Sequence, residues 1–278
     1  MKKACVIGWP ITHSRSPLIH NYWLKKHAID AIYEKTAIHP NDVNSFVTDF
    51  RKSGLIGCNV TAPHKEAVFN AVADVDVAAQ RLGALNTIYI KDGNVRGTNT
   101  DGEGYLASLR QSHPSHEIKG GTTVIIGAGG AAKAIIGALI DGGGQRIGIV
   151  NRTPDRVESL QKQFGSTIYP VTSENYETAI AACDLFINTT SLGMSGQPPL
   201  EFNIDSLPRK AIVSDIVYSP LETSLLKHAR FRGNPTLGGL GMLLHQAVRG
   251  FELWFGVRPE VTEELYDLVA ADVLRAPT

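Results

Sequence analysis

Two charged residues, Lys65 and Asp101, lie in neutral polar surroundings that could support proton transfer. Lys65 follows a short apolar run and a turn-forming proline in GCNVTAPHKEAV, and Asp101 occurs in GTNTDGEGY. Each is placed where a predicted strand gives way to a predicted helix, which is where open α/β sheets bind ligands. A Lys–Asp pair could relay a hydroxyl proton and polarise a carbonyl, as an alcohol–ketone interconversion requires. A structural salt bridge, or two unrelated surface charges, would give the same spacing.

Neutral hydrogen-bonding side chains accompany these two charges in several stretches of the chain. They suit a polyhydroxylated small molecule better than a phosphorylated one. Most of them lie near predicted strand ends, in THSRSP, NVTAPHK, LNT and DIVYSP. The residues are Ser14, Ser16, Thr61, Asn86, Tyr218 and Gln246.

A glycine-rich turn in TTVIIGAGGAAKAIIGALI predicts a dinucleotide site. An apolar strand ends at Gly127, and a helix begins within the following glycines. Gly127, Gly129 and Ala132 fit the G-x-G-x-x-G/A pattern, in which small residues let a pyrophosphate approach the backbone. The helix N-terminus then presents free N–H groups to the phosphates. We therefore expect Gly127, Ala128, Gly129, Gly130 and Ala131 to contact the cofactor.

The end of the next predicted strand favours NADP over NAD. An NAD site usually has an acid there to bind the ribose hydroxyls. This strand, RIGIV, is instead followed by Asn151, Arg152 and Thr153, with Arg156 close behind. Guanidinium groups bind a 2′-phosphate well, and a carboxylate would repel it. The alternative is that both arginines are ordinary surface residues.

The order of predicted elements indicates an α/β protein with two domains. Strands and helices alternate over the first hundred residues, with a hairpin across KDGN and with Ser16 as the expected N-cap of a helix. After a linker, QSHPSHEIKGG, a second alternating unit follows, and the chain ends in two helices. We expect a substrate domain with a mainly parallel sheet at 1–101 plus 239–278. A Rossmann-like NADP-binding domain would occupy 102–238, with a cleft between the two.

Composition excludes several classes of function. The 278 residues are 43% hydrophobic, and 27 Lys+Arg balance 27 Asp+Glu, so no bulk attraction to nucleic acid or anionic membranes is expected. The three cysteines are widely spaced and predict buried thiols in a reducing compartment, and no stretch predicts a membrane span. His13, His20 and His27 recur every seven residues but favour structural roles over a metal site. We expect a soluble cytoplasmic protein without a metal.

The motifs together resemble the shikimate dehydrogenase family. The similarity runs from VIGWPITHSRSPLIHN through GCNVTAPHKEAV, LGALNT, GTNTDGEGY, VIIGAGGAAKAI and IVNRTPDR, and then through INTTSLGM and DIVYSPLETSLL to GLGMLLHQAVRGFELW. It covers nearly the whole chain in the family's order. The resemblance implies an oxidoreductase acting on a CH–OH group. The reaction would be the NADP-dependent interconversion of 3-dehydroshikimate and shikimate, in the pathway to chorismate and the aromatic amino acids.

The resemblance also implies roles for individual residues. Lys65 and Asp101 match the catalytic pair, and both also contact substrate. Ser14 and Ser16 match serines that hold the substrate carboxylate with help from Tyr218, while other residues bind hydroxyls. The hydroxyl-binding positions are Thr61, Asn86 and Gln246, and the positions at the nicotinamide end are Gly239 and Met242. Monomers and homodimers both occur in the family. One departure is Gly238, where the family usually has Asp or a similar polar residue.

Two rival functions are considered. Quinate dehydrogenases share the fold and most site residues, and those that prefer NAD usually carry an acid near the second strand, so NRTPDR argues against that activity. A regulator that binds the dinucleotide without turnover would be expected to lack Lys65 or Asp101. Both residues are present, so this alternative is disfavoured.

Overall fold

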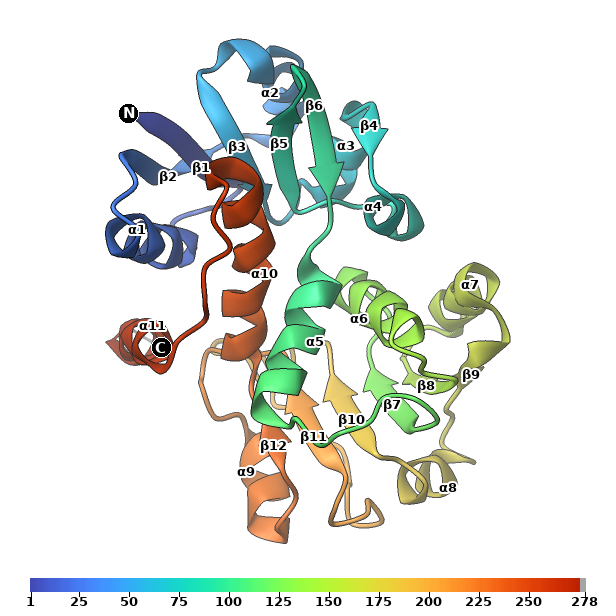
Figure 1. Cartoon of the computed structure of the whole chain (residues 1–278). Coiled ribbons are helices and arrows are strands. Elements are labelled where there is room, and N and C mark those ends of the chain that lie inside the picture. The colour runs from blue at the N-terminus through green and yellow to red at the C-terminus, as the bar shows by residue number, and fades with distance from the viewer. Residues whose placement is uncertain (276–278) are drawn as a thin grey trace. The chain divides into compact units, whose positions relative to one another are not determined.

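The protein divides into two compact units. The computed structural model describes residues 1–275. Unit 1 consists of Met1–Gly104 and Leu244–Val269, and unit 2 consists of Tyr105–Leu243 with the residues from Ala270 on. Three helices contribute residues to both units: α5 (Asp101–Ser112), α10 (Gly239–Phe255) and α11 (Glu263–Arg275). The expected α/β class with two sheet domains is confirmed (Figure 1).

Unit 1 contains a six-stranded mixed sheet in the order β2-β1-β3-β5-β6-β4. The pairs β1–β2, β1–β3 and β4–β6 are parallel, whereas β5 is antiparallel to both β3 and β6. The strands are β1 (Lys2–Gly8), β2 (Ala31–Ala37), β3 (Leu55–Val60), β4 (Asp74–Val75), β5 (Thr87–Lys91) and β6 (Asn94–Thr98).

The predicted hairpin across KDGN is the β5–β6 pair. Its two central residues, Asp92 and Gly93, have φ of 51° and 73°, the left-handed conformation that tight two-residue hairpins need. Because β5 runs antiparallel to β3, it begins beside the end of β3, and β6 returns to the same edge (Figure 1). The ends of β3 and β6 and the start of β5 therefore lie together.

Helices cover both faces of the unit 1 sheet. One buried cluster joins residues of α2, α3 and α4 to β1, β3 and β5. On the other face, the rings of Trp23 in α1 and of Phe251 and Trp254 in α10 gather around His20 and Tyr33. The helices are α1 (Ser16–Lys26), α2 (Val43–Asp49), α3 (Lys65–Ala71) and α4 (Val77–Leu82), with 3₁₀ turns at Pro40–Asp42 and Phe50–Lys52.

Ser16 is not the N-cap of α1, contrary to the prediction. Helix α1 begins at Ser16 itself, and its N-cap is Arg15, which makes no side-chain capping bond. Pro17 alone supplies the start signal, because its fixed φ suits the first turn. The Ser16 hydroxyl is therefore not engaged in a cap.

Unit 2 has a six-stranded parallel sheet in the order β12-β11-β10-β7-β8-β9. The strand order reverses beside β7, which creates the kind of switch point where open α/β sheets bind ligands. The strands are β7 (Thr122–Ile126), β8 (Arg146–Val150), β9 (Ile168–Pro170), β10 (Leu185–Asn188), β11 (Ile212–Asp215) and β12 (Thr236–Leu237).

Two hydrophobic cores sandwich this parallel sheet. Strand β7 sends Ile125 into one core and Val124 and Ile126 into the other, as the twofold alternation of a strand requires. The first core is closed by α5, α6 and α7, and the second by α8 and α9. The helices are α6 (Gly130–Asp141), α7 (Pro154–Phe164), α8 (Tyr176–Ala181) and α9 (Ser224–Arg232), with a 3₁₀ turn at Gly165–Thr167.

The cysteines and the helices can be compared with the expectations drawn from composition. Cys5, Cys58 and Cys183 are all free and buried, as expected of small hydrophobic side chains. Within residues 1–275, none of the helices has the length and apolar character needed to cross a bilayer.

Candidate active site

Lys65 and Asp101 form an ion pair in unit 1. Lys65 is the first residue of α3 and Asp101 the first of α5, and Lys65 Nζ lies 2.5 Å from Asp101 Oδ2. The two side chains are 32% and 14% exposed, so the pair is partly shielded but reachable by a ligand. Spacing alone could not show this pairing, since the residues come from different strand–helix junctions.

The pair forms because the β5–β6 hairpin brings its two ends to the end of β3. The amide of Val60, the last residue of β3, donates to Asn86 O at 2.8 Å, and the Asn86 amide donates to Thr98 O at 3.1 Å. The Leu85 amide in turn donates to the Lys65 carbonyl at 3.1 Å. Backbone bonds therefore fix the spacing of the two junctions.

Asn86 is the hydrogen-bonding centre of the site. Its side-chain amide Nδ2 donates to Asp101 Oδ1 at 2.8 Å and approaches Gln246 Oε1 at 3.4 Å. Its Oδ1 accepts from the Thr100 amide at 3.0 Å and from Thr87 Oγ1 at 2.9 Å. Asn86 is almost fully buried, so these bonds hold the Asp101 carboxylate in one orientation.

Gln246 on α10 is brought to this cluster by close helix contact. Thr100 Oγ1 donates to the Gln246 carbonyl at 2.7 Å. A Cβ on Gly104 of α5 would lie 2.6 Å from the Gln246 backbone nitrogen, so only glycine allows this approach. Thr100 and Gly104 were not predicted as site residues. Both stand in the TNTDGEGY stretch, and the glycine is the residue that could have signalled the contact.

Ser14 and Ser16 lie together at the start of α1. Ser14 Oγ donates to Ser16 Oγ at 3.3 Å, and the Ser16 amide donates to Ser14 Oγ at 3.3 Å. The Ser16 side chain also interacts with the Tyr33 hydroxyl. Burial raises the pKa of Tyr33 well above its usual value, so its hydroxyl remains protonated and can donate.

A buried network connects the two serines to the Lys65–Asp101 pair. Tyr33 Oη donates to Asn59 Oδ1 at 2.5 Å, and Asn59 Nδ2 donates to Thr87 Oγ1 at 3.2 Å. Thr87 then bonds Asn86, which bonds Asp101. Tyr33, Asn59 and Thr87 were not predicted to matter. Asn59 and Thr87 stand inside quoted motifs, but Tyr33 lies in an ordinary strand pattern and gave no signal.

Two buried histidines near the site are structural. His20 stacks on Tyr33 with ring centroids 4.1 Å apart, and burial lowers the pKa of His20 to about 3. His64, the neighbour of Lys65, places Nε2 2.8 Å from the Ile38 carbonyl. Both rings are buried in the core, which agrees with the structural role expected for His20.

Thr61 is the remaining predicted substrate residue of unit 1. It directly follows β3, and its amide donates to the Ile7 carbonyl at 2.9 Å. A Cβ on Gly8 would come within 2.7 Å of Thr61 Cγ2, so the glycine makes room for the threonine. The structure thus gathers the ends of β1, β3 and β6 at one edge, together with the start of β5.

The glycine-rich turn of unit 2 has the geometry of a phosphate cradle. Gly127 has φ of 105°, and a Cβ there would lie 2.7 Å from Thr189 Oγ1, so only glycine fits. A Cβ on Gly129 or Gly130 would meet nothing within 4 Å, which leaves the backbone open to a ligand. Gly129 caps α6 without a side-chain bond, so the first amides of α6 are available to an anion. Ala128 is buried and Ala131 is half-buried.

A hollow of about 350 Å³ adjoins this cradle. It is lined by Ile126, Gly127, Val150, Asn151, Arg152, Thr153, Arg156, Thr190, Leu192 and Phe202. Arg152 and Arg156 are exposed, and neither guanidinium group forms a hydrogen bond or ion pair within the part of the chain that the structure describes. Asn151 Nδ2 donates to the Thr153 carbonyl at 2.9 Å and shapes the turn. Two unpaired guanidinium groups beside an open glycine turn fit the phosphates of NADP.

Tyr218, Gly239 and Met242 belong to unit 2. Tyr218 lies in the segment between β11 and α9, and Met242 packs against the first core. A Cβ on Gly239 would lie 2.0 Å from the Ile216 carbonyl oxygen, so α10 begins in direct contact with the end of β11. A Cβ on Gly238 would find its nearest neighbour at 3.7 Å, so a larger residue fits there.

A buried carboxyl group anchors the segment that carries Tyr218. Asp215 Oδ1 accepts from Asn188 Nδ2 at 2.9 Å and from the Val217 amide at 3.0 Å, and Oδ2 accepts from Thr223 Oγ1 at 2.8 Å. Burial raises the pKa of Asp215 to about 6, against the effect of these donors. Sequence reasoning did not single out Asp215, although it stands in the DIVYSP motif.

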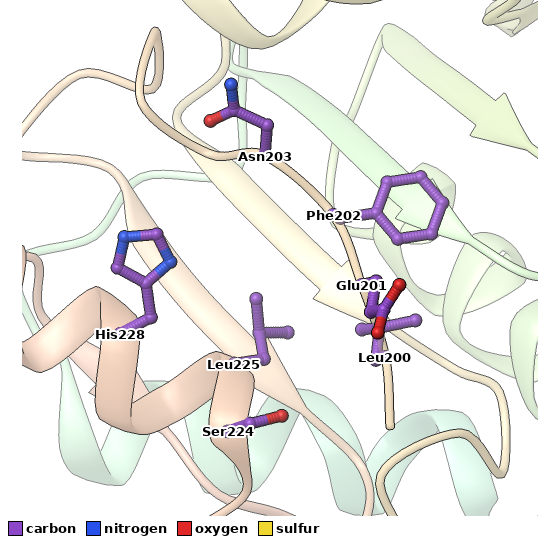
Figure 2. Close-up of a pocket in the computed structure, with 7 residues that line it drawn as sticks. All are labelled: Leu200, Glu201, Phe202, Asn203, Ser224, Leu225 and His228. Atoms are coloured by element: carbon purple, nitrogen blue, oxygen red, sulfur yellow. The ribbon is translucent and has the colours of Figure 1, made fainter. Parts of the chain in front are cut away.

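A second hollow of unit 2, of about 490 Å³, lies between α9 and the segment 200–203 (Figure 2). Its lining comprises Leu200, Glu201, Phe202, Asn203, Ser224, Leu225 and His228. None of the predicted site residues lines it. Phe202 lines this hollow, and Figure 2 shows its ring projecting on the side of segment 200–203 away from His228.

Comparisons with known proteins match this chain over nearly its full length. The matching family models are shikimate dehydrogenase substrate binding domain at residues 6–88, shikimate/quinate 5-dehydrogenase at 108–194, and shikimate 5′-dehydrogenase C-terminal domain at 239–263. A shikimate dehydrogenase (NADP(+)) from Nitrobacter winogradskyi is 49% identical over 273 residues, which are 98% of this chain and 97% of that protein.

Two solved structures show the same fold. Shikimate 5-dehydrogenase from Thermus thermophilus, in complex with NADP(H) and shikimate, has a TM-score of 0.87 and 30% identity, covering 98% of this chain and all of that one (100%). Quinate dehydrogenase from Corynebacterium glutamicum, in complex with NAD, has a TM-score of 0.88 and 30% identity, covering 97% and 99%.

Proposed function

The chain belongs to the shikimate dehydrogenase family, and we propose that Lys65 and Asp101 are the catalytic residues of its NADP-dependent, reversible reduction of 3-dehydroshikimate to shikimate. The reaction is a step towards chorismate and the aromatic amino acids. The observation that supports the catalytic assignment is the 2.5 Å contact between Lys65 Nζ and Asp101 Oδ2, in a pair that is oriented by Asn86 and still partly exposed.

In the proposed mechanism Lys65 moves the proton and Asp101 holds Lys65 in place. NADPH supplies the hydride when it is bound. The substrate carbonyl lies against the Lys65–Asp101 pair, so that the Lys65 ammonium polarises the carbonyl and gives a proton to the developing alkoxide. Asp101 keeps Lys65 in position through the ion pair, and Asn86 fixes Asp101 in turn. In the reverse direction the same pair accepts the hydroxyl proton.

The other residues of unit 1 bind the substrate. The adjacent hydroxyls of Ser14 and Ser16 could both donate hydrogen bonds to a carboxylate. We therefore assign them to the substrate carboxylate, with help from Tyr218. Thr61, Asn86 and Gln246 would bind ring hydroxyls, together with Lys65 and Asp101. Neutral donors and acceptors at this edge match an uncharged polyol ring.

We assign cofactor binding to unit 2. Gly127 to Ala131 would hold the pyrophosphate, while Asn151, Arg152, Thr153 and Arg156 would hold the 2′-phosphate. Gly239 and Met242 would line the nicotinamide end. We propose a substrate domain at 1–101 plus 239–278, of which 276–278 lie outside the described residues, and an NADP domain at 102–238. The protein would act as a monomer or homodimer. Free, buried thiols support a cytoplasmic setting, and no nucleic-acid or membrane partner is proposed.

Quinate is the second substrate to consider, because a relative of the same fold is a quinate dehydrogenase. Quinate carries an added hydroxyl and a saturated ring, and a pocket often rejects such an addition weakly. The arginines after β8 favour NADP(H), which distinguishes this chain from a site built for NAD.

The test is an oxidation assay of shikimate and quinate, each with NADP⁺ and NAD⁺, on the wild type and on Lys65→Met. We expect turnover chiefly with shikimate and NADP⁺, and a loss of about 10²–10⁴-fold in kcat for Lys65→Met with substrate affinity much less changed. Lys91→Met, on the far end of the hairpin, is the matched control. Near-normal kcat in Lys65→Met would refute the catalytic assignment, and comparable quinate rates would refute the substrate preference.

A further inference from the structure

Phe202 provides an aromatic ring on the wall of the nucleotide hollow. That hollow combines basic and apolar lining. Arg152 and Arg156 are basic, whereas the apolar residues are Ile126, Val150, Leu192 and Phe202. Of these, Leu192 and Phe202 come from the connection between β10 and β11, which lies outside the glycine turn and the NRT motif. The arginines fit the phosphates of the cofactor, whereas Leu192 and Phe202 pack on one side against the second core of unit 2 and also border the hollow.

The position of the Phe202 ring is supported by contacts with Tyr176. It is half-buried and packs against Tyr176 of α8, with ring centroids 5.9 Å apart at an angle of 46°. The Tyr176 hydroxyl donates to the carbonyl of Asn203, the next residue, at 2.7 Å. Burial raises the pKa of Tyr176, so this hydroxyl stays protonated and keeps its bond. The ring therefore has a fixed position before any ligand arrives.

The orientation of Phe202 directs it to the nucleotide side. Phe202 atoms line both hollows of unit 2, but Figure 2 shows the ring projecting away from His228 and from α9. Leu200 and Leu225 remain on the α9 side. Phe202 is also a lining residue of the hollow that contains Arg152 and Gly127, so its side chain borders that hollow.

We propose that Phe202, with Leu192, is the platform on which the adenine ring of NADP(H) stacks, and that Tyr176 is its positioning residue. A purine has an apolar face with a polar edge, and stacking on an aromatic side chain contributes substantially to binding whatever the base. The arginines would then select the 2′-phosphate, while Phe202 would contribute affinity for any adenine nucleotide. This inference rests on the proposed assignment of the hollow to NADP(H).

The experiment measures calorimetric binding of 2′,5′-ADP and 5′-AMP to the full-length protein. For Phe202→Ala we expect both ligands to bind about 5- to 100-fold more weakly, by a similar factor. For Arg152→Ala only 2′,5′-ADP should weaken. Phe202→Tyr, which keeps the ring, should stay within about 3-fold of the wild type, and Tyr176→Phe should lose about 2- to 5-fold. Phe231→Ala, at a phenylalanine that is 92% exposed, is the matched control.

The outcomes separate the two assignments. If the wild type does not bind 2′,5′-ADP, the hollow is not the cofactor site and the assignment of the hollow falls along with the platform. If the wild type binds and Phe202→Ala binds equally well, only the adenine platform is overturned. Should Phe202→Ala fail to fold, as judged by circular dichroism, Phe202→Leu replaces it, since leucine keeps apolar volume but lacks the aromatic face. Unchanged affinity in Phe202→Leu and Tyr176→Phe would then overturn the platform.

Discussion

The Lys65–Asp101 cluster of unit 1 and the hollow beside the glycine turn of unit 2 are built in opposite ways. In unit 1, Lys65, Asp101 and Asn86 are bonded to one another, and further bonds lead through the core to Ser16. In unit 2, the guanidinium groups of Arg152 and Arg156 have no bonded partner among the described residues, and Gly129 faces open space.

This difference matches what each region has to do. Groups that transfer a proton must be held within a narrow range of geometry, so bonds formed during folding position them before the substrate arrives. Groups that hold a phosphate need free donors, because an arginine already paired with an acid would have to break that pair first. The order in one region and the openness of the other thus both fit the proposed roles.

The largest expected effect is a loss of stability in unit 2, and it tests whether this unit, despite its open hollow, also contains rigid packing. Gly239→Ala would place a Cβ 2.0 Å from the Ile216 carbonyl oxygen, a backbone atom that cannot easily move. We expect a loss of about 3 kcal/mol or more in the free energy of unfolding, measured by urea denaturation. Gly238→Ala has room and should be nearly neutral. Equal stability of the two variants would show that the start of α10 adapts.

The second prediction concerns the polar network of unit 2. Asp215 has a pKa of about 6 in the folded protein, above its ordinary value of 3.8, so the folded state holds this proton more tightly than the unfolded chain. The contribution of Asp215 to stability therefore falls as pH rises from about 4 to about 6, by roughly 3 kcal/mol at most, and is constant above that range.

The substitution Asp215→Asn isolates this contribution. Asparagine keeps the Oδ1 acceptor used by the Val217 and Asn188 donors but does not titrate. Relative to the wild type, the variant should gain stability as pH rises from 4 to 6, as followed by urea denaturation across that range. A stability difference that is independent of pH would contradict the raised pKa.

The third prediction sharpens the contrast through the free arginines. Arg152→Ala should raise the KM for NADP⁺ about 10- to 100-fold, because a charge-assisted contact to the 2′-phosphate is lost, while the KM for NAD⁺ should barely change. Steady-state kinetics with both cofactors measures the ratio. Arg209→Ala, at an exposed arginine outside the hollow, is the control. An equal increase in the KM values for NADP⁺ and NAD⁺ would mean that Arg152 does not bind the 2′-phosphate.

The smallest expected effect tests the ordered side of the comparison. Tyr33→Phe removes the hydroxyl that bonds Asn59 and interacts with Ser16. We expect about 1 kcal/mol lower stability and a KM for shikimate raised about 2- to 5-fold at nearly constant kcat. Tyr22→Phe loses an exposed bond to Glu264 and serves as the control. If KM stays constant while stability falls, the network supports the fold without positioning the serines.

Local rules predicted the features that depend on neighbouring residues in the chain. The glycine turn at Gly127, the hairpin across Asp92 and Gly93, and the placement of Lys65 and Asp101 at strand–helix junctions all follow from such rules. The Ser16 N-cap was wrong, because the helix begins at Ser16 itself, one residue earlier than a cap at that position would allow.

Features that depend on distant residues could not be predicted. Tyr33 looks like an ordinary strand residue until the fold places it between Ser16 and Asn59. The role proposed for Phe202 depends on the β10–β11 connection, which brings Phe202 into the same hollow as Arg152. No spacing in the sequence predicts that both residues line one hollow. The pairing of Lys65 with Asp101 needed either the fold or the family resemblance.

The β5–β6 hairpin has a consequence for how this chain can vary. Asn86 and Asp101 are kept in place by the ladder that pairs Thr87 with Thr98, whereas the turn at Asp92 and Gly93 lies at the opposite end of that ladder. Extra residues inserted at this turn would lengthen the tip without changing which residues face each other at the base. The turn is therefore a suitable attachment point for a peptide tag or a fluorescent label that leaves the chemistry undisturbed.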